Sequence, residues 1–134
     1  MRASLRALVR RRAGNRCEYC HLRQEHSPLV QFHVEHVIPR QHGGKSNASN
    51  LALACYRCNL HKGPNLSGIN PDDGAIVTLF SPRQQLWDEH FEMRGALVVG
   101  LTPTGRATVR VLNINAIDRL RLRSELRLRG LLDA

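Results

Sequence analysis

Two Cys-x-x-Cys pairs constrain the fold of this chain more than any other feature. The first pair is formed by Cys17 and Cys20, and the second by Cys55 and Cys58. Each pair can form a zinc knuckle, a turn in which the backbone brings both thiolates to one ion. Two knuckles complete the closed tetrahedral site of structural zinc. The stretch between the pairs is longer than in a plain zinc ribbon, so a strand and a loop can extend from the four-cysteine zinc site. We therefore expect one structural Zn²⁺ bound by all four cysteines.

Other interpretations of the cysteines are less consistent with the sequence. A redox Cys-x-x-Cys motif comes as a single pair at the start of a helix, whereas this chain has two pairs; four buried free thiols remain the other alternative. Residues 1–16 carry positive charge but lack the apolar segment of a secretory signal, and no apolar run is long enough to span a membrane. We expect a cytoplasmic protein without a membrane partner, where reduced cysteine pairs serve as metal ligands.

The charge balance indicates a polyanionic partner. The chain has 20 Lys and Arg against 11 Asp and Glu, a formal net charge of +9, and nearly all of its basic residues are Arg. Genomic base composition can explain Arg in place of Lys, but it does not explain the excess of positive charge. Arg suits phosphate oxygens, so nucleic acid is the expected partner. Two basic clusters are candidates for phosphate contact, and we expect one of them to be a solvated helix face. The clusters are Arg10, Arg11, Arg12 and Arg16, then Arg119, Arg121, Arg123, Arg127 and Arg129.

Local patterns in the first half predict two helices and two strands. Apolar residues at helical spacing predict a helix over residues 2–13, ended by Gly14. Period-two alternation predicts a strand over 29–38, and a short apolar run predicts another over 51–54, with a Gly-rich loop over 40–49 between them. Residues 58–62 read as a short helix.

The second half is predicted to be rich in strands. Residues 75–80, 96–101 and 108–112 read as strands, with 102–105 as a hairpin turn between the last two. Residues 66–73 form a turn-rich connector, and 84–93 fit either a helix or a strand. Residues 115–132 read as a basic helix capped by Asn115, although the Arg-Leu alternation at 119–122 also fits a strand. We expect residues 1–65 as the core with the knuckles and 66–134 as an extension packed on it as one domain.

A polar set lies between and beside the knuckles. Neutral His36 suits a general base, because an unperturbed imidazole titrates near neutral pH. Glu35 and Asn59 offer oxygen ligands for a hard divalent ion such as Mg²⁺ or Mn²⁺. Asn50 can bond the His36 ring or backbone and fix its orientation. Taken alone, each of these residues is weak evidence for a catalytic site. Their positions relative to the two knuckles make that interpretation stronger.

At this point the chain resembles the HNH endonuclease family. The blocks that carry the resemblance are CEYC, HVEHVIPRQHGG and NLALACYRCNLHKG, running from Cys17 to Lys62 in a specific order. The resemblance implies an α+β chain with a ββα-metal (His-Me finger) core, in which a hairpin and a helix clasp one divalent ion. We expect that core to be clipped by the four-cysteine zinc site and flanked by an N-terminal helix and a C-terminal strand and helix extension.

The resemblance also implies roles for residues. His36 would be the general base, Asn50 the positioning residue, and Glu35 and Asn59 the metal ligands in the hydrolysis of DNA phosphodiester bonds. Many relatives carry Asp in place of Glu35 and His in place of Asn59, and both pairs of residue types keep a metal-binding atom. The motif around Phe80 and Arg83, with Trp87 and His90, looks like the extension of small stand-alone bacterial HNH proteins.

Several neighbouring residues are weaker candidates. Arg40, His61 and Lys62 are candidates for contact with substrate phosphates, although surface exposure is the default for the last two. His33 shares a strand face with Glu35; it could be a third ligand or a substrate contact, but we favour a half-buried strand histidine. His42 could line the groove. In the extension, we favour a core role for Trp87.

Two alternatives to a DNA endonuclease stay open. A zinc-stabilised DNA-binding protein with little or no catalysis would explain the cysteines and the charge, but it has no need for the polar set. An RNase is the other, because no residue is identified that would read a 2′-hydroxyl. A homodimer is the simple route to cutting both strands at a palindrome, and a larger nuclease complex is another.

Overall fold

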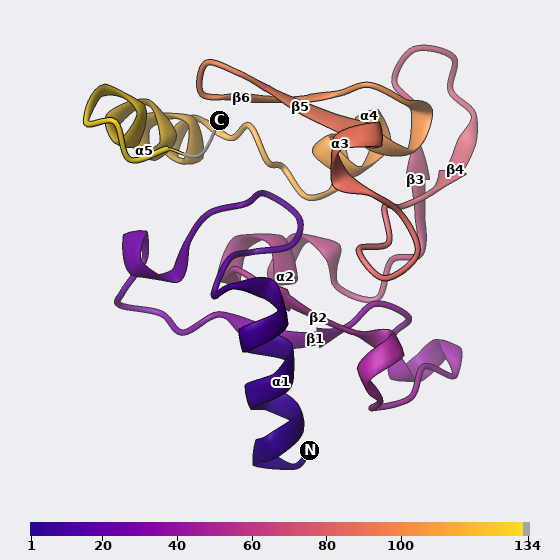
Figure 1. The fold of residues 1–134 in the computed structure, drawn as a ribbon. Coiled ribbons are helices and arrows are strands. Elements are labelled where there is room, and N and C mark those ends of the chain that lie inside the picture. Colours follow the sequence, from indigo (N-terminus) through magenta and orange to yellow (C-terminus); the bar gives the residue numbers. More distant parts are fainter. Residues whose placement is uncertain (133–134) are drawn as a thin grey trace. The chain divides into compact units, whose positions relative to one another are not determined.

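The computed structural model describes residues 1–132 and divides into two compact units (Figure 1). Unit 1 comprises Met1–Leu66 with Ser81–Gln85, and unit 2 comprises Ser67–Phe80 with residues 86–132. The structure mixes helices with three two-stranded antiparallel sheets, which confirms the α+β class. Packing of the two halves as one domain stays a prediction. No described helix is both long enough and apolar enough to cross a membrane.

Unit 1 begins with α1 (Ala3–Ala13), as predicted. The helix ends at Gly14, whose left-handed φ of 64° lets its N–H bond back to the last turn. Val9 is fully buried. Arg10 donates to the Phe32 carbonyl at 2.9 Å, and Arg12 donates to the Leu51 carbonyl at 2.7 Å. Part of the first basic cluster therefore fastens α1 to the hairpin that follows.

The hairpin of unit 1 pairs β1 (His33–His36) with β2 (Leu51–Ala54) in antiparallel register, with His33 opposite Ala54 and His36 opposite Leu51. Short 3₁₀ turns lie before it (η1, Gln24–His26) and within its connection (η2, Arg40–His42; η3, Ala48–Asn50). β1 is shorter than the predicted strand over 29–38 because β2 supplies only four partners. Leu29 is almost fully exposed, as expected outside a sheet.

α2 (Tyr56–Lys62) follows β2 and begins two residues before the predicted helix. Cys55 caps it, because its sulfur accepts a hydrogen bond from the Cys58 N–H at 3.4 Å. The second knuckle is thus also the first turn of the helix. A metal ligand therefore determines where α2 starts.

The described part of unit 2 contains two hairpins and three helices. β3 (Ser67–Ile69) pairs with β4 (Ile76–Thr78), and β5 (Phe91–Arg94) pairs with β6 (Leu97–Gly100). α3 (Trp87–His90) precedes β5, so the ambiguous stretch contains both a helix and a strand. Trp87 packs on Phe91 with ring centroids 5.1 Å apart, but it is only half-buried, so it borders the core and does not lie within it as we favoured.

The predicted hairpin turn over 102–105 and strand over 108–112 are wrong. These residues form α4 (Pro103–Val111). The Thr102 hydroxyl accepts a hydrogen bond from the Gly105 N–H at 3.0 Å, and Pro103 occupies the first turn. A Thr N-cap followed by Pro is a helix start, and here that signal outweighs the β-branched residues further along.

The last helix, α5 (Ile117–Leu128), corrects two further expectations. Its N-cap is Ala116, while the predicted cap, Asn115, bonds both backbone groups of Val98. Arg119 and Arg123 are buried and donate to backbone carbonyls, including those of Leu112 and Ile114. These two arginines therefore hold unit 2 together and do not belong to a phosphate-binding surface.

Candidate active site and metal centre

The four cysteines gather in one buried cluster. Their sulfur atoms all lie within 4.8 Å of one another, and the Cys20 and Cys55 sulfurs are 3.8 Å apart. Four sulfurs held about 2.3 Å from one ion in a tetrahedron would be roughly 3.8 Å apart, so the cluster fits a single metal. Burial raises the pKa of the Cys17 and Cys58 thiols well above the ordinary value. The cluster can hold a structural metal, and taking one up must displace protons.

The cluster joins the elements that carry the polar set. The first knuckle pairs with β2 through Glu18, whose N–H donates to the Leu53 carbonyl at 2.9 Å and whose carboxylate accepts from the Leu53 N–H at 2.8 Å. The second knuckle connects β2 to α2. Arg83 also ion-pairs with Glu18, so the Ser81–Gln85 segment of unit 1 is tied to the first knuckle. Because β2 pairs with β1, the knuckles position the strand and the helix that face each other.

A pocket of about 260 Å³ opens where β1 ends and α2 runs past. It brings together three of the four predicted catalytic and metal-binding residues, together with the substrate candidate Arg40. The lining residues are His33, Val34, Glu35, His36, Pro39, Arg40, Asn59 and Gly63. His33 is exposed on this rim, not half-buried as favoured from the sequence. Asn50 and His42 lie outside the lining.

His36 is half-buried, with its ring held by a residue that the sequence did not single out. Its Nε2 lies 2.8 Å from the Ser46 hydroxyl, and Arg40 donates to the same oxygen at 3.0 Å. Partial burial, Arg40 and Lys62 all lower the pKa of His36 from its ordinary 6.5. The imidazole is therefore neutral at physiological pH, the form that can accept a proton.

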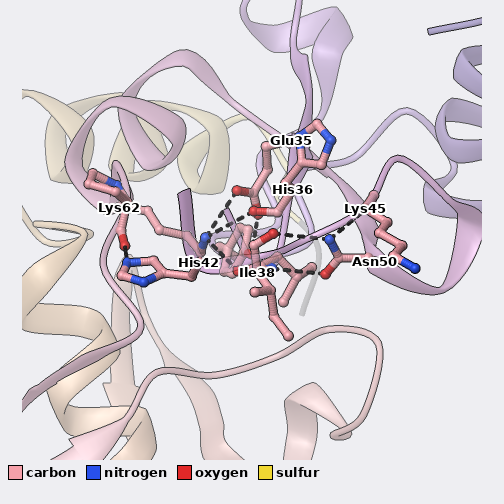
Figure 2. A network of polar contacts seen from close by, with 10 residues as sticks. Glu35, His36, Ile38, His42, Lys45, Asn50 and Lys62 are labelled. Atoms are coloured by element: carbon pink, nitrogen blue, oxygen red, sulfur yellow. Dashed lines mark hydrogen bonds and ion pairs between the residues drawn. The ribbon is translucent and has the colours of Figure 1, made fainter. Parts of the chain in front are cut away.

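Glu35 is the most enclosed residue of the pocket. Its carboxylate accepts a hydrogen bond from the Tyr19 hydroxyl. It also pairs with the Lys62 ammonium at 3.2 Å, as Figure 2 shows. Burial raises the pKa of Glu35, while Lys62 and the Tyr19 hydrogen bond oppose that rise. Only 7% of the residue is exposed.

Lys62 is buried, so the default of surface exposure is wrong for this residue. Its ammonium lies within 3.2 Å of Glu35 and of the carbonyls of His36 and Val37 (Figure 2). These three acceptors match the three donors of an ammonium group. Lys62 therefore clamps the end of β1 and does not face the solvent where a phosphate would lie.

Asn50 holds the backbone beside His36 and does not touch its ring. Its side-chain oxygen accepts from the Ile38 N–H at 2.9 Å, and its amide donates to the carbonyls of Ile38 and Lys45, both at 3.0 Å (Figure 2). The loop passes so closely that a Cβ on Gly44 would lie 1.6 Å from the Ile38 carbonyl oxygen. Asn50 and Gly44 thus set the path of the chain from His36 to Ser46.

The other candidate residues make fewer contacts with the site. His42 bonds the Pro64 carbonyl at 3.1 Å and ties the loop to the chain after α2. His61 is half-buried on α2. The sequence did not lead us to predict a role for Tyr19 or Ser46, or the contact of Lys62 with the end of β1. Tyr19 is hidden inside a cysteine motif, and a lone Ser in a loop gives no signal of its own.

The donor chemistry of the pocket fits a divalent ion. Within residues 1–132, only the cysteines form a group of three or more His, Cys, Asp or Glu side chains able to surround a metal. Mg²⁺ is usually held by one or two protein oxygens, with waters and substrate phosphate completing its shell. Glu35 and Asn59 supply that kind of set, although Glu35 would have to share its carboxylate with Lys62.

Comparison with known proteins identifies the segment that carries this site. The sequence model of the HNH endonuclease family matches residues 17–65. Septu protein PtuB of Bacillus thuringiensis is 32% identical to the chain over 111 residues, which cover 81% of this chain and 40% of that protein. The chain thus spans less than half the length of this relative. No solved structure gives a significant match.

Proposed function

We propose that this chain, whose residues 17–65 are an HNH endonuclease domain, is a metal-dependent endonuclease that hydrolyses DNA phosphodiester bonds. The observation that carries the proposal is the pocket itself. A neutral histidine, His36, lines it beside a carboxylate, an amide and an arginine. A module that only binds DNA has no use for this combination. The family points to a nucleic acid substrate, in agreement with the net charge of +9.

His36 is the proposed general base. Its pKa lies below 6.5, so the ring is unprotonated at neutral pH and can take a proton from water. Since Nε2 is engaged by Ser46, Nδ1 is the nitrogen that would receive that proton. Lys62 fixes the backbone at this residue through the carbonyls of His36 and Val37, and Asn50 fixes it two residues later at Ile38.

Glu35 and Asn59 are the proposed ligands of the catalytic Mg²⁺ or Mn²⁺. When bound, such an ion supplies positive charge to the phosphoryl and leaving oxygens. Arg40 is exposed on the pocket rim, where its guanidinium can contact a phosphate. His61 remains a candidate for a second phosphate contact.

We propose that the cysteine cluster holds Zn²⁺, because four thiolates with this spacing form a closed structural site. A closed site has no open position for water, so its role is to hold the strand and the helix together. A homodimer is the simple route to cutting both strands at a palindrome, and a larger nuclease complex is the other proposed assembly.

A nicking assay tests the proposal. Supercoiled plasmid is incubated with the protein in Mg²⁺, Mn²⁺ or EDTA, and His36→Ala is compared with the matched variant His42→Ala. His42 is a suitable control because it lies on the same loop but outside the pocket lining. We expect metal-dependent nicking by the wild type and by His42→Ala, and none by His36→Ala, with DNA retardation on a gel unchanged for all three.

The same assay separates the alternatives. A chain that retards DNA but never cuts it, in any metal and with partner proteins present, would favour a zinc-stabilised binding protein. Cleavage of RNA in place of plasmid DNA would favour an RNase. Loss of DNA binding together with cutting in His36→Ala would refute the assignment of His36 as the base.

A further inference from the structure

We propose that Ser46 is a positioning residue that holds the His36 ring in the tautomer able to act as a base. This inference rests on the proposed function and deepens it. The family resemblance assigns no role to Ser46, and its position in a polar loop did not mark it. The geometry around its hydroxyl is what points to the role.

The Ser46 hydroxyl connects two residues of the pocket. It lies 2.8 Å from Nε2 of His36, and Arg40 donates to it at 3.0 Å. Arg has only donors, so the serine oxygen is the acceptor in the second contact. A serine oxygen has two acceptor sites, which leaves one site and its own proton for His36.

Only one of the two neutral tautomers of His36 leaves a ring nitrogen that can accept a proton from water. If the Ser46 hydroxyl donates to Nε2, the ring carries its proton on Nδ1, and neither nitrogen has a lone pair available to water. If Nε2–H donates to Ser46, Nδ1 keeps its lone pair. In that arrangement a proton passes from water to Nδ1 and the Nε2–H bond to Ser46 stays in place, so the imidazolium retains its partner.

The loop that carries Ser46 is held firmly. The carbonyl of the preceding residue, Lys45, accepts a hydrogen bond from Asn50 at 3.0 Å, and Gly44 passes directly against the backbone of Ile38. The same Asn50 side chain bonds Ile38, two residues after His36. One asparagine thus fixes both ends of the path between the base and its partner, so removing the Ser46 hydroxyl should leave this path unchanged.

The test compares three variants of the full chain. Ser46→Ala removes the hydroxyl, Ser46→Thr keeps it, and Ser49→Ala is the matched control. Ser49 is an exposed serine of the same loop whose hydroxyl bonds Asn47 at 2.7 Å and lies outside the pocket lining. We measure kcat and KM for nicking of plasmid DNA, the melting temperature, and the protonated nitrogen of His36 by ¹⁵N NMR.

We expect Ser46→Ala to lower kcat by about 10- to 100-fold, the usual loss when a group orienting a functional residue is removed. KM and the melting temperature should stay near the wild-type values. Ser46→Thr should recover most of kcat, and Ser49→Ala should match the wild type. In the NMR spectrum the proton should sit on Nε2 of His36 in the wild type and redistribute between the two nitrogens in Ser46→Ala.

An unchanged kcat in Ser46→Ala would overturn the proposal, as would an equal loss in Ser49→Ala or a His36 proton on Nδ1 in the wild type. The NMR measurement does not require cleavage. If the wild type cuts no substrate, the proposed function fails while the spectrum still decides whether Ser46 sets the tautomer. The two failures are therefore distinguishable.

Discussion

The buried pair of Glu35 and Lys62 allows a quantitative prediction about stability. Replacing Lys62 with Met keeps a side chain of similar length but leaves the carboxylate without its cation, in a residue that is only 7% exposed. Breaking a buried ion pair in this way costs about 3–5 kcal/mol. The carbonyls of His36 and Val37 lose their ammonium donor as well. We expect the unfolding free energy of Lys62→Met to fall by about this amount, with the end of β1 loosened.

The loss should depend on pH in a defined direction. Burial already raises the pKa of Glu35 above 4.5, and Lys62 opposes this rise, so Lys62→Met raises the pKa further. A carboxyl whose pKa is raised on folding favours the folded state only while it is protonated, and this contribution is lost as the pH rises through the folded-state pKa. The difference in unfolding free energy between wild type and Lys62→Met should therefore grow as the pH rises above the ordinary carboxyl pKa of 4.5, and measurements at about pH 5.5 and about pH 8 test this direction.

Urea unfolding of the zinc-loaded chain at both pH values measures this difference. Lys45→Met is the matched control, because Lys45 is exposed and the substitution should change stability little. The double variant Glu35→Gln/Lys62→Met removes both charges and should be more stable than Lys62→Met alone. A loss below about 1 kcal/mol, within the range of an exposed pair, or a loss that shrinks with rising pH would refute the reasoning.

Three further predictions concern the base, the cluster and a helix cap. Partial burial, Arg40 and Lys62 lower the pKa of His36, so the nicking rate should fall on acidification only below pH 6.5. Arg40→Gln should raise the pKa of His36 and so move this fall in the pH–rate profile to a higher pH. Stripping the cysteine cluster with a chelator should unfold unit 1 by circular dichroism, and metal uptake should weaken as the pH falls because binding releases protons. Thr102→Ala should cost about 0.5–2 kcal/mol of unfolding free energy, since α4 loses its cap; an unchanged urea midpoint would contradict this.

The parts of the fold that the sequence predicted correctly depend on local signals. α1 follows from its apolar spacing and its glycine stop, and β2 from four apolar residues before a knuckle. The cysteine cluster follows from ligand spacing, since two Cys-x-x-Cys knuckles have few other uses. The extension was predicted less well, because Thr102 and Pro103 read equally as a turn or as a helix start.

The sequence by itself determined the chemistry available to this protein: four thiolates for a structural metal, an imidazole beside a carboxylate, and a strongly basic chain. Only the tertiary structure decided which residues are buried and which meet. It buried Lys62 against Glu35 and Arg123 against backbone carbonyls, and it brought Ser46 to His36. The physical reason is that burial and pairing depend on contacts between distant parts of the chain, which no local pattern of residues specifies.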